Sequence, residues 1–301
     1  MIYTVTLNPA LDYVMQLPSL LPGDTNRAEG EELQVGGKGI NVSLVLAQLG
    51  LESTALGFLA GDTGKLLHRR VEELGLRTDF LFLPAGQTRI NVKVKGGLET
   101  ELNGRGPDVP PQSMEALLAR LDALRAGDTL ILSGSLPPSL SPHTYGDILA
   151  HVAGKAVRCV VDAAGEPLLN ALPYGPFLVK PNLEELSGLV GESLSPTDLP
   201  ALTRAAQQLR RQGAENVLVS LGGSGALLAA GDGAVHLQPA PQGLLKNSVG
   251  SGDSMVAGFL AAYPQGYQAA LRLSVAAGSA TAFSMTLASG PEIHQILRQL
   301  S

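Results

Sequence analysis

Short apolar runs alternate with segments of helical spacing along the C-terminal two thirds of the chain, and this alternation constrains the fold more than any other feature. The apolar runs are Thr129–Ser133, Val157–Asp162, Phe177–Lys180 and Asn216–Ser220; the helical segments are Pro142–Ala153, one that opens at Asn182, and Thr197–Gln212. Strands that are apolar along their whole length are typical of a parallel sheet with helices on both faces. The pattern therefore predicts an α/β fold built on βαβ units, with a mostly parallel sheet.

A different pattern in the N-terminal third predicts a second, smaller sheet. Residues Thr88–Lys95 alternate apolar and polar side chains, as a strand with one solvated face does, and Gly96-Gly97 follows as a turn. The other candidate strands are Tyr13–Leu17, Leu33–Val35 and Leu98–Asn103. We expect an antiparallel lid, inserted at about residues 12–36 and 88–104 into a single domain that spans residues 1–301.

Composition and charge argue against several classes of function. The 301 residues carry 27 acidic and 21 basic side chains, a net charge of −6, and no basic stripe with interleaved aromatics, so no nucleic-acid partner is expected. A small anionic substrate is compatible with this charge, because two or three suitably positioned Lys or Arg side chains can bind it inside an acidic protein. Cys159 is the single cysteine, which rules out an intrachain disulfide. Without a basic signal-peptide region or an apolar run near the ~20 residues that span a bilayer, we expect a cytoplasmic protein with no membrane partner.

The segment Gly250-Ser251-Gly252-Asp253 precedes an apolar helical pattern, Met255–Leu260. Glycines at the start of a helix let backbone N–H groups bind an anion, and the helix dipole adds to this. An Asp there repels the anion and needs another role, which a general base that takes a hydroxyl proton supplies. An Asp that caps its own helix is the alternative, which so short a motif leaves open.

A second glycine segment, Gly36-Gly37-Lys38-Gly39, leads into the helical pattern Ser43–Leu49. Its Lys38, with Asn41 just after it, could bind a sugar hydroxyl or a phosphate. The segment is neither a P-loop nor a dinucleotide fingerprint, because the glycine spacing is wrong for both. Taken alone, a tight turn that enters a helix is the simpler interpretation.

Asn182 and Glu185 stand on one face of the helix predicted after Pro181. Their oxygens could hold the water shell of Mg²⁺. The alternative is a helix-capping box, which the local sequence taken alone favours. Loops at Ser133–Pro138 and Ser220–Gly225 follow predicted strands, where open parallel sheets bind ligands. The histidines show no metal-ligand spacing, so no zinc site is expected.

Taken together and in this order, these segments resemble the ribokinase-like carbohydrate kinases of the pfkB type. The matching motifs are Asn8-Pro9-Ala10-Leu11-Asp12, Gly36–Val42, Thr88–Lys93, Ser133–Pro137, Lys180-Pro181-Asn182 and Gly250–Ser254. Thr88–Lys93 is most similar to the 1-phosphofructokinase branch, whose neighbours are tagatose-6-phosphate kinase and the minor 6-phosphofructokinase. The resemblance implies a ribokinase-like three-layer α/β/α fold with a mostly parallel sheet and a small antiparallel β lid.

The resemblance also implies a role for each matched residue. Asp253 is the expected general base, and the amides of Gly250, Ser251 and Gly252 form the expected anion hole. The expected substrate-binding residues are Asp12, Gly37, Lys38, Asn41, Arg89 and Ser135, with Lys38 and Arg89 at the substrate phosphate. The expected ATP-binding residues are Lys180, Asn182, Ser220, Gly222, Gly223, Gly225 and Ser248. Asn182 and Glu185 are expected to hold Mg²⁺ through water.

The reaction expected from this resemblance is the phosphorylation of fructose-1-phosphate by ATP with Mg²⁺, in a homodimer formed through the lid. Tagatose-6-phosphate and fructose-6-phosphate stay open as substrates, and a sensor that binds a sugar phosphate without turnover is a distant alternative. A nicotinamide oxidoreductase is not expected, because Leu7–Ala10 stands where its Gly-x-Gly-x-x-Gly turn would be. Asn247 departs from the family pattern and leaves nucleotide or cation contacts open, and Arg105 matches no family position.

Overall fold

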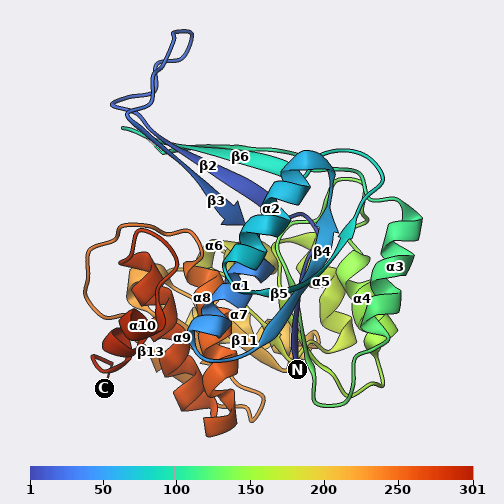
Figure 1. Ribbon diagram of the computed structural model, residues 1–301. Helices are drawn as coiled ribbons and strands as arrows, with labels where there is room; N and C mark the ends of the chain where they lie inside the picture. Colours follow the sequence, from blue (N-terminus) through green and yellow to red (C-terminus); the bar gives the residue numbers. More distant parts are fainter. Residues whose placement is uncertain (98, 301) are drawn as a thin grey trace.

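The main sheet has nine strands in the order β13-β12-β11-β10-β9-β8-β1-β4-β5 (Figure 1). They are β1 (Ile2–Thr6), β4 (Ser53–Leu59), β5 (Arg77–Phe82), β8 (Thr129–Ser133), β9 (Arg158–Asp162), β10 (Leu178–Val179), β11 (Asn216–Ser220), β12 (Ala226–Ala229) and β13 (Val235–Gln238). Neighbours are parallel from β5 to β11, and β12 and β13 join antiparallel at one edge. The computed structural model describes residues 1–97 and 99–300.

Helices cover both faces of this sheet. On one face lie α1 (Lys38–Gln48), α2 (Gly61–Glu73), α8 (Ser251–Ala262), α9 (Tyr267–Ala282) and α10 (Gly290–Leu297). On the other lie α3 (Pro111–Leu121), α4 (Thr144–Val152), α5 (Glu166–Ala171), α6 (Leu183–Val190) and α7 (Leu199–Arg211). Single-turn helices are η1 (Leu172–Tyr174), η2 (Gly222–Ser224) and η3 (Tyr263–Gln265). The three-layer α/β/α architecture predicted from the sequence is confirmed.

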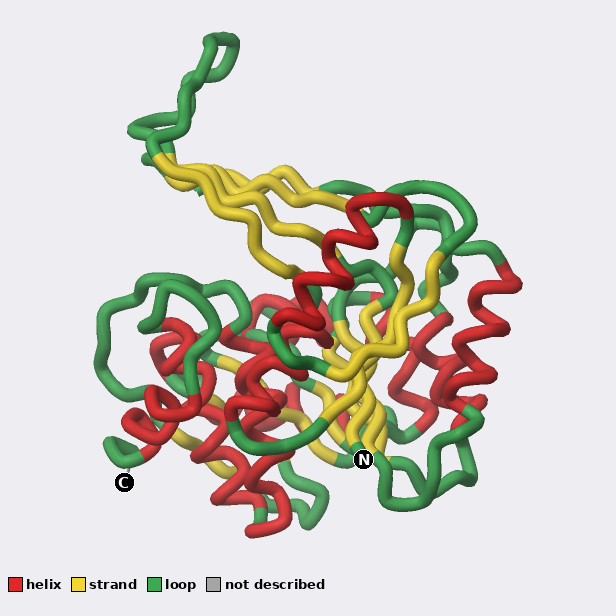
Figure 2. The backbone as a smooth tube through the Cα atoms, in the orientation of Figure 1, coloured by secondary structure: helices red, strands yellow, loops and turns green. Residues whose placement is uncertain are grey.

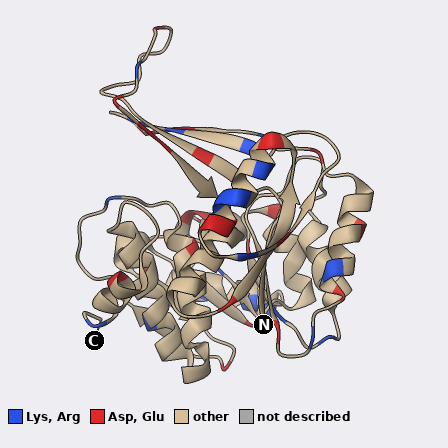
Figure 3. Ribbon diagram, in the orientation of Figure 1, with Lys and Arg blue, Asp and Glu red and all other residues tan. Residues whose placement is uncertain are grey.

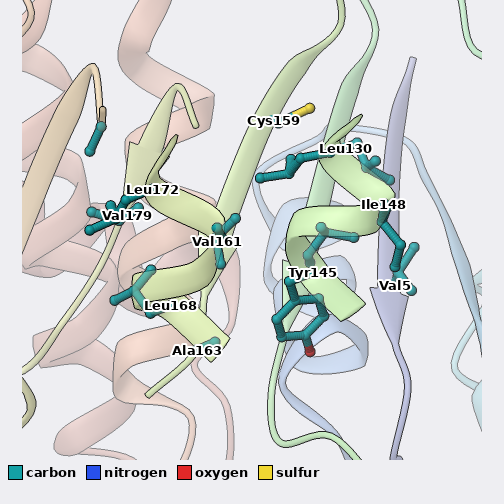
Figure 4. Packing of buried hydrophobic residues seen from close by; sticks show 14 of the residues in the cluster. Val5, Leu130, Tyr145, Ile148, Cys159, Val161, Ala163, Leu168, Leu172 and Val179 are labelled. Atoms are coloured by element: carbon teal, nitrogen blue, oxygen red, sulfur yellow. The ribbon is translucent and has the colours of Figure 1, made fainter. Parts of the chain in front are cut away.

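Side chains of the central strands alternate between the two helical layers, which explains why the strands are apolar throughout. In β8, Leu130 belongs to the core cluster under α4, whereas Ile131 belongs to the opposite cluster under α1, α8 and α9. In Figure 4, Ile148 of α4 lies close to Leu130 and to Val5 of β1, and Tyr145 of the same helix belongs to the same core cluster. Each such side chain, fully removed from water, contributes about 1.5–3 kcal/mol to folding.

Helix α1 begins at Lys38, earlier than the Ser43 predicted from apolar spacing. Gly39 allows this early start, because a Cβ there would lie 2.5 Å from Thr6 Oγ1 and 3.3 Å from the carbonyl oxygen of Val5. Since β1 passes that close to the first turn of α1, no larger residue fits without a shift. The contact fixes the start of α1 at the carboxyl end of the sheet.

The smaller sheet has the order β3-β2-β6-β7 and projects from the body of the molecule (Figure 1). Its strands are β2 (Ala10–Gln16), β3 (Gly30–Gly36), β6 (Arg89–Lys95) and β7 (Thr100–Asn103). The outer pairs, β2–β3 and β6–β7, are antiparallel as predicted, but the central pair β2–β6 is parallel. Both central strands leave the same edge of the body, so they run in one direction. The loop between β2 and β3 extends beyond the sheet (Figure 2), and Leu98 lies outside the described residues.

Within residues 1–97 and 99–300, no helix has the length and apolar character needed to span a bilayer. In the view of Figure 3, Lys and Arg are interspersed with Asp and Glu over the ribbon and do not gather into a stripe. Cations able to bind a small anion are instead found inside a cavity beneath the lid.

Candidate active site

A cavity of about 1190 Å³ lies between the lid sheet and the carboxyl edge of the main sheet. Every residue that the sequence singled out as catalytic, substrate-binding, ATP-binding or metal-binding lines this cavity: Asp12, Gly37, Lys38, Asn41, Arg89, Ser135, Lys180, Asn182, Glu185, Ser220, Gly222, Gly223, Gly225, Ser248, Gly250, Ser251, Gly252 and Asp253. The fold gathers them because parallel strands end at one edge, where the loops and helix N-termini meet.

Asp253 lies in the first turn of α8, not in the turn before it, because the helix already begins at Ser251. The N-cap is Gly250, with φ +79°, a conformation that glycine adopts without strain. Asp253 therefore does not cap its own helix. Its buried carboxylate instead accepts a 2.8 Å hydrogen bond at Oδ2 from Nδ2 of Asn41, in the first turn of α1.

Burial, and next the nearby carboxylate of Asp162, raise the pKa of Asp253 to about 6, against the opposing effects of Lys38, Asn41 and Lys180. A carboxyl group whose pKa lies near neutrality is a better proton acceptor than an ordinary Asp and is still ionised at pH 7. The first amides of α8 have no partners within the helix and point toward the same space. A proton acceptor thus stands beside an anion-binding helix end.

Asp162, which the sequence motifs did not include, joins two of the predicted cations. Its Oδ1 lies 3.2 Å from Lys38 Nζ and 3.4 Å from Lys180 Nζ, and its side chain is buried. Burial alone would raise the pKa of Asp162, but Lys180 and Lys38 hold it below the usual range; Asp162 in turn raises the pKa of Lys38. Lys180 also reaches α8, since a Cβ on Gly252 would lie 2.8 Å from Nζ. Both lysine side chains thus lie near the anion-binding helix end.

Arg89 stands at another part of the cavity, where the lid meets the body. Its guanidinium donates from Nε to the carbonyl oxygen of Asn8 (3.1 Å), from Nη1 to that of Gly104 (3.4 Å) and from Nη2 to Oγ of Ser135 (3.5 Å). The structure thus brings Arg89 and Ser135 together, and their role at a substrate phosphate stays a prediction. Lys38 is bound to Asp162 instead, so its predicted part in the same phosphate clamp stays a prediction.

Asn182 and Glu185 form a complete capping box at the start of α6. Glu185 N donates to Asn182 Oδ1 (2.7 Å), and Asn182 N donates to Glu185 Oε2 (2.8 Å). The structural alternative is therefore present, yet both side chains also line the cavity. No group of three or more His, Cys, Asp or Glu in residues 1–97 and 99–300 could enclose a metal ion.

A profile of the pfkB family carbohydrate kinases matches residues 5–293, nearly the whole chain. The chain belongs to this family. The 1-phosphofructokinase of Bacillus subtilis is 42% identical over 302 residues, covering 100% of this chain and 98% of its own. The D-tagatose-1-phosphate kinase of Bacillus licheniformis is 32% identical, with the same coverage. Phosphofructokinase-2 from Escherichia coli, solved with substrates and products, superposes with a TM-score of 0.93 at 31% identity and 99% coverage of both chains.

Several residues that line the cavity of this pfkB kinase had no signal in the sequence. Apolar side chains of Leu245, Val275, Ala282 and Phe283 form a wall beside the predicted ATP loops. An apolar wall of this kind suits a planar base, but such residues are ordinary core residues in a sequence pattern. Asp162, which contacts two lysines that line the cavity, carries a weak signal as the carboxylate at the end of the predicted strand Val157–Asp162.

Asn247, which departs from the family pattern, and Arg105, which matches no family position, both make contacts within their own loops. Asn247 bonds to the backbone of Val249, with Oδ1 accepting from N at 3.2 Å and Nδ2 donating to O at 3.4 Å. The guanidinium of Arg105 pairs with Asp108 at 3.2 Å on the surface, while the carbonyl of Arg105 accepts from Asn8. Both contacts shape loops at the rim of the cavity.

Proposed function

We propose that this pfkB kinase transfers the γ-phosphoryl group of ATP to O6 of fructose-1-phosphate, which gives fructose-1,6-bisphosphate and ADP. The observation that carries the proposal is the buried carboxylate of Asp253, with its raised pKa, at the N-terminus of α8. Membership in a kinase family implies ATP as the phosphoryl donor. An ATP-dependent reaction suits a cytoplasmic protein, and that location stays a prediction.

The chemistry assigns each buried group one task. Asp253 takes the proton of the acceptor hydroxyl, whose oxygen forms the new bond to the γ-phosphorus while the bond to the β,γ-bridging oxygen breaks and ADP leaves. The amides of Gly250, Ser251 and Gly252 face the oxygens of the moving group, and Lys180 adds a positive charge beside them. Most of the rate then comes from positioning and from electrostatic stabilisation of the transition state.

Magnesium fits this cavity as an ion held mainly by phosphate oxygens and water. The capping box uses Oε2 of Glu185 and leaves Oε1 outside it, so Asn182 and Glu185 are the residues that would bind the hydrated ion. An ion with a single protein carboxylate is ordinary for Mg²⁺ in nucleotide sites, which keep several waters. When bound, the ion neutralises charge on the β- and γ-phosphates.

Fructose-1-phosphate is favoured as the substrate because the 1-phosphofructokinase of Bacillus subtilis is similar over the full length of the chain. The second candidate is tagatose-1-phosphate, since the kinase of that name is 32% identical. In both cases Arg89 and Ser135 would bind the phosphate at one end of the sugar, and Asp253 would meet the hydroxyl at the other. Asp12 and Asn41 would bind the hydroxyls between them.

ADP release by purified protein with ATP and Mg²⁺ tests this function. Fructose-1-phosphate, tagatose-1-phosphate, fructose-6-phosphate and tagatose-6-phosphate are offered separately, with Asp253→Asn as the matched variant. We expect the highest kcat/KM with fructose-1-phosphate and a loss of about 10²–10⁴-fold in kcat in the variant, while ATP binding is kept. A preference for another sugar changes the substrate but not the mechanism. Absence of turnover with all four would favour a sensor and refute the enzyme.

We further propose that two copies pair through their lids. Along β6, Ile90 and Val92 fall on one face of the lid sheet, and Leu102 of β7 stands opposite Val92 on that face. Ile90 is 43% exposed and Leu102 is 60% exposed. A second copy would cover these apolar side chains.

A further inference from the structure

Lys93 is a buried cation that the proposed reaction does not use. It belongs to β6, its Nζ lies 2.8 Å from Oδ2 of Asp12 on β2, and the two side chains are only 8% and 10% exposed. Along β6, Arg89, Asn91 and Lys93 share one face of the lid sheet, because side chains alternate in a strand. Arg89 and Asn91 line the cavity, and Lys93 lies behind them, farther out along the strand.

The carboxylate of Asp12 is held from three directions. Lys93 binds Oδ2, and Nδ2 of Asn91 donates to Oδ1 at 2.9 Å. On the third side Gly36 of β3 packs against it, since a Cβ there would lie 2.8 Å from Cγ. Each carboxylate oxygen can accept more than one hydrogen bond, so Asp12 can still bind a ligand hydroxyl in the cavity while its orientation stays fixed.

Stability alone gives little reason for a buried Lys93–Asp12 pair. Replacing such a pair by well-packed apolar side chains is often neutral or stabilising, because taking both charges out of water is costly. An apolar residue at 93 would also have a neighbour to pack against, since Val14 stands opposite in the strand register. The position of the pair beside the cavity points to a role in ligand binding.

Hydrogen bonds connect this pair to the phosphate end of the cavity. Oδ1 of Asn91 accepts from the amide of Gly104 at 3.2 Å, and the carbonyl of Gly104 accepts from Arg89 at 3.4 Å. Asp12, Asn91, Gly104 and Arg89 thus form one chain of contacts. We propose that Lys93 is a positioning residue, which fixes Asp12 at a set distance from Arg89 and so selects sugar phosphates by the spacing of their hydroxyls from their phosphate.

This inference rests on the proposed function in one respect, that Asp12 binds the sugar. Lys93→Met keeps an unbranched side chain one atom shorter and removes the charge, whereas Lys93→Arg keeps a positive charge. We expect Lys93→Met to raise KM for the sugar phosphate by about tenfold or more, with KM for ATP within about twofold of the wild type, as loss of a ground-state sugar contact requires. We also expect a smaller ratio of kcat/KM between fructose-1-phosphate and its C4 epimer tagatose-1-phosphate, and partial recovery in Lys93→Arg.

Lys95→Met is the matched control, because Lys95 lies on the same strand and the same face but, among the described residues, makes no ion pair with Asp12. It should leave all constants near the wild-type values. Lys93→Gln, which keeps a donor without the charge, serves if Lys93→Met does not fold, as judged by thermal unfolding. The sugar followed is whichever one the wild type uses best, so a wrong substrate assignment does not affect the test. Equal increases in both KM values, or an unchanged sugar KM in a folded variant, would overturn the role of Lys93.

Discussion

The raised pKa of Asp253 makes the pH profile of the reaction predictable. A general base acts only when deprotonated, and burial sets the pKa of this carboxyl at about 6, so kcat should fall by about tenfold per pH unit as the pH drops below 6. Steady-state rates measured between pH 5 and 8, at saturating substrates, would show this decrease in kcat. Substrate phosphates also titrate near pH 6. The residual rate of Asp253→Asn separates the titration of Asp253 from that of the substrate phosphates. Only a decrease in rate caused by the substrate would persist in this variant. A flat wild-type profile down to pH 5 would remove Asp253 as the base.

For individual residues of the site, the sequence suggested a role where the chemistry can be read from a short motif and none where it depends on a distant partner. Asp253, Lys38 and Asn41 belong to glycine-rich segments whose chemistry can be read locally. Asp162 stands in no motif, and Lys93 stands in the motif Thr88–Lys93 but received no role from it. Both contact partners far away in the chain, such as the Asp12 that pairs with Lys93. No spacing rule places two such residues together, since the contact arises from the register of neighbouring strands.

The capping box at the start of α6 allows its structural and metal-binding roles to be separated. Asn182→Ala removes the side-chain acceptor for the amide of Glu185 and should lower the free energy of unfolding by about 0.5–2 kcal/mol, as measured by urea titration. Glu185→Gln keeps a side chain that can complete the box, so stability should change by less than about 0.5 kcal/mol. It removes the charge, however, and should raise the Mg²⁺ concentration for half-maximal rate several-fold. An unchanged Mg²⁺ requirement would leave the pair with a capping role only.

Helices α4, α6 and α7 and the central strands of the main sheet from β8 to β11 followed from the sequence because their signals are local. β8, β9 and β11 lie where continuous apolar runs stand, and each is buried by a helical layer on both sides. The parallel pairing of β2 with β6 has no local signal, since β3, α1, β4, α2 and β5 lie between the two strands in the chain. The early start of α1 was missed for a similar reason: Gly39 looks like a helix breaker until its contact with β1 is known.

For the whole molecule, the lid gives a prediction about assembly. Burying Ile90 and Leu102 removes exposed apolar surface from water, so a homodimer should form, with twice the chain mass of 31.1 kDa by light scattering at micromolar concentration. Leu102→Glu places a charge in that face and should yield the monomer. Leu237→Glu is the matched control, because Leu237 is 48% exposed on β13, the edge strand of the main sheet, and should leave the mass unchanged. A wild-type monomer under these conditions, or dissociation by Leu237→Glu alone, would show that the lid face is not the contact between copies.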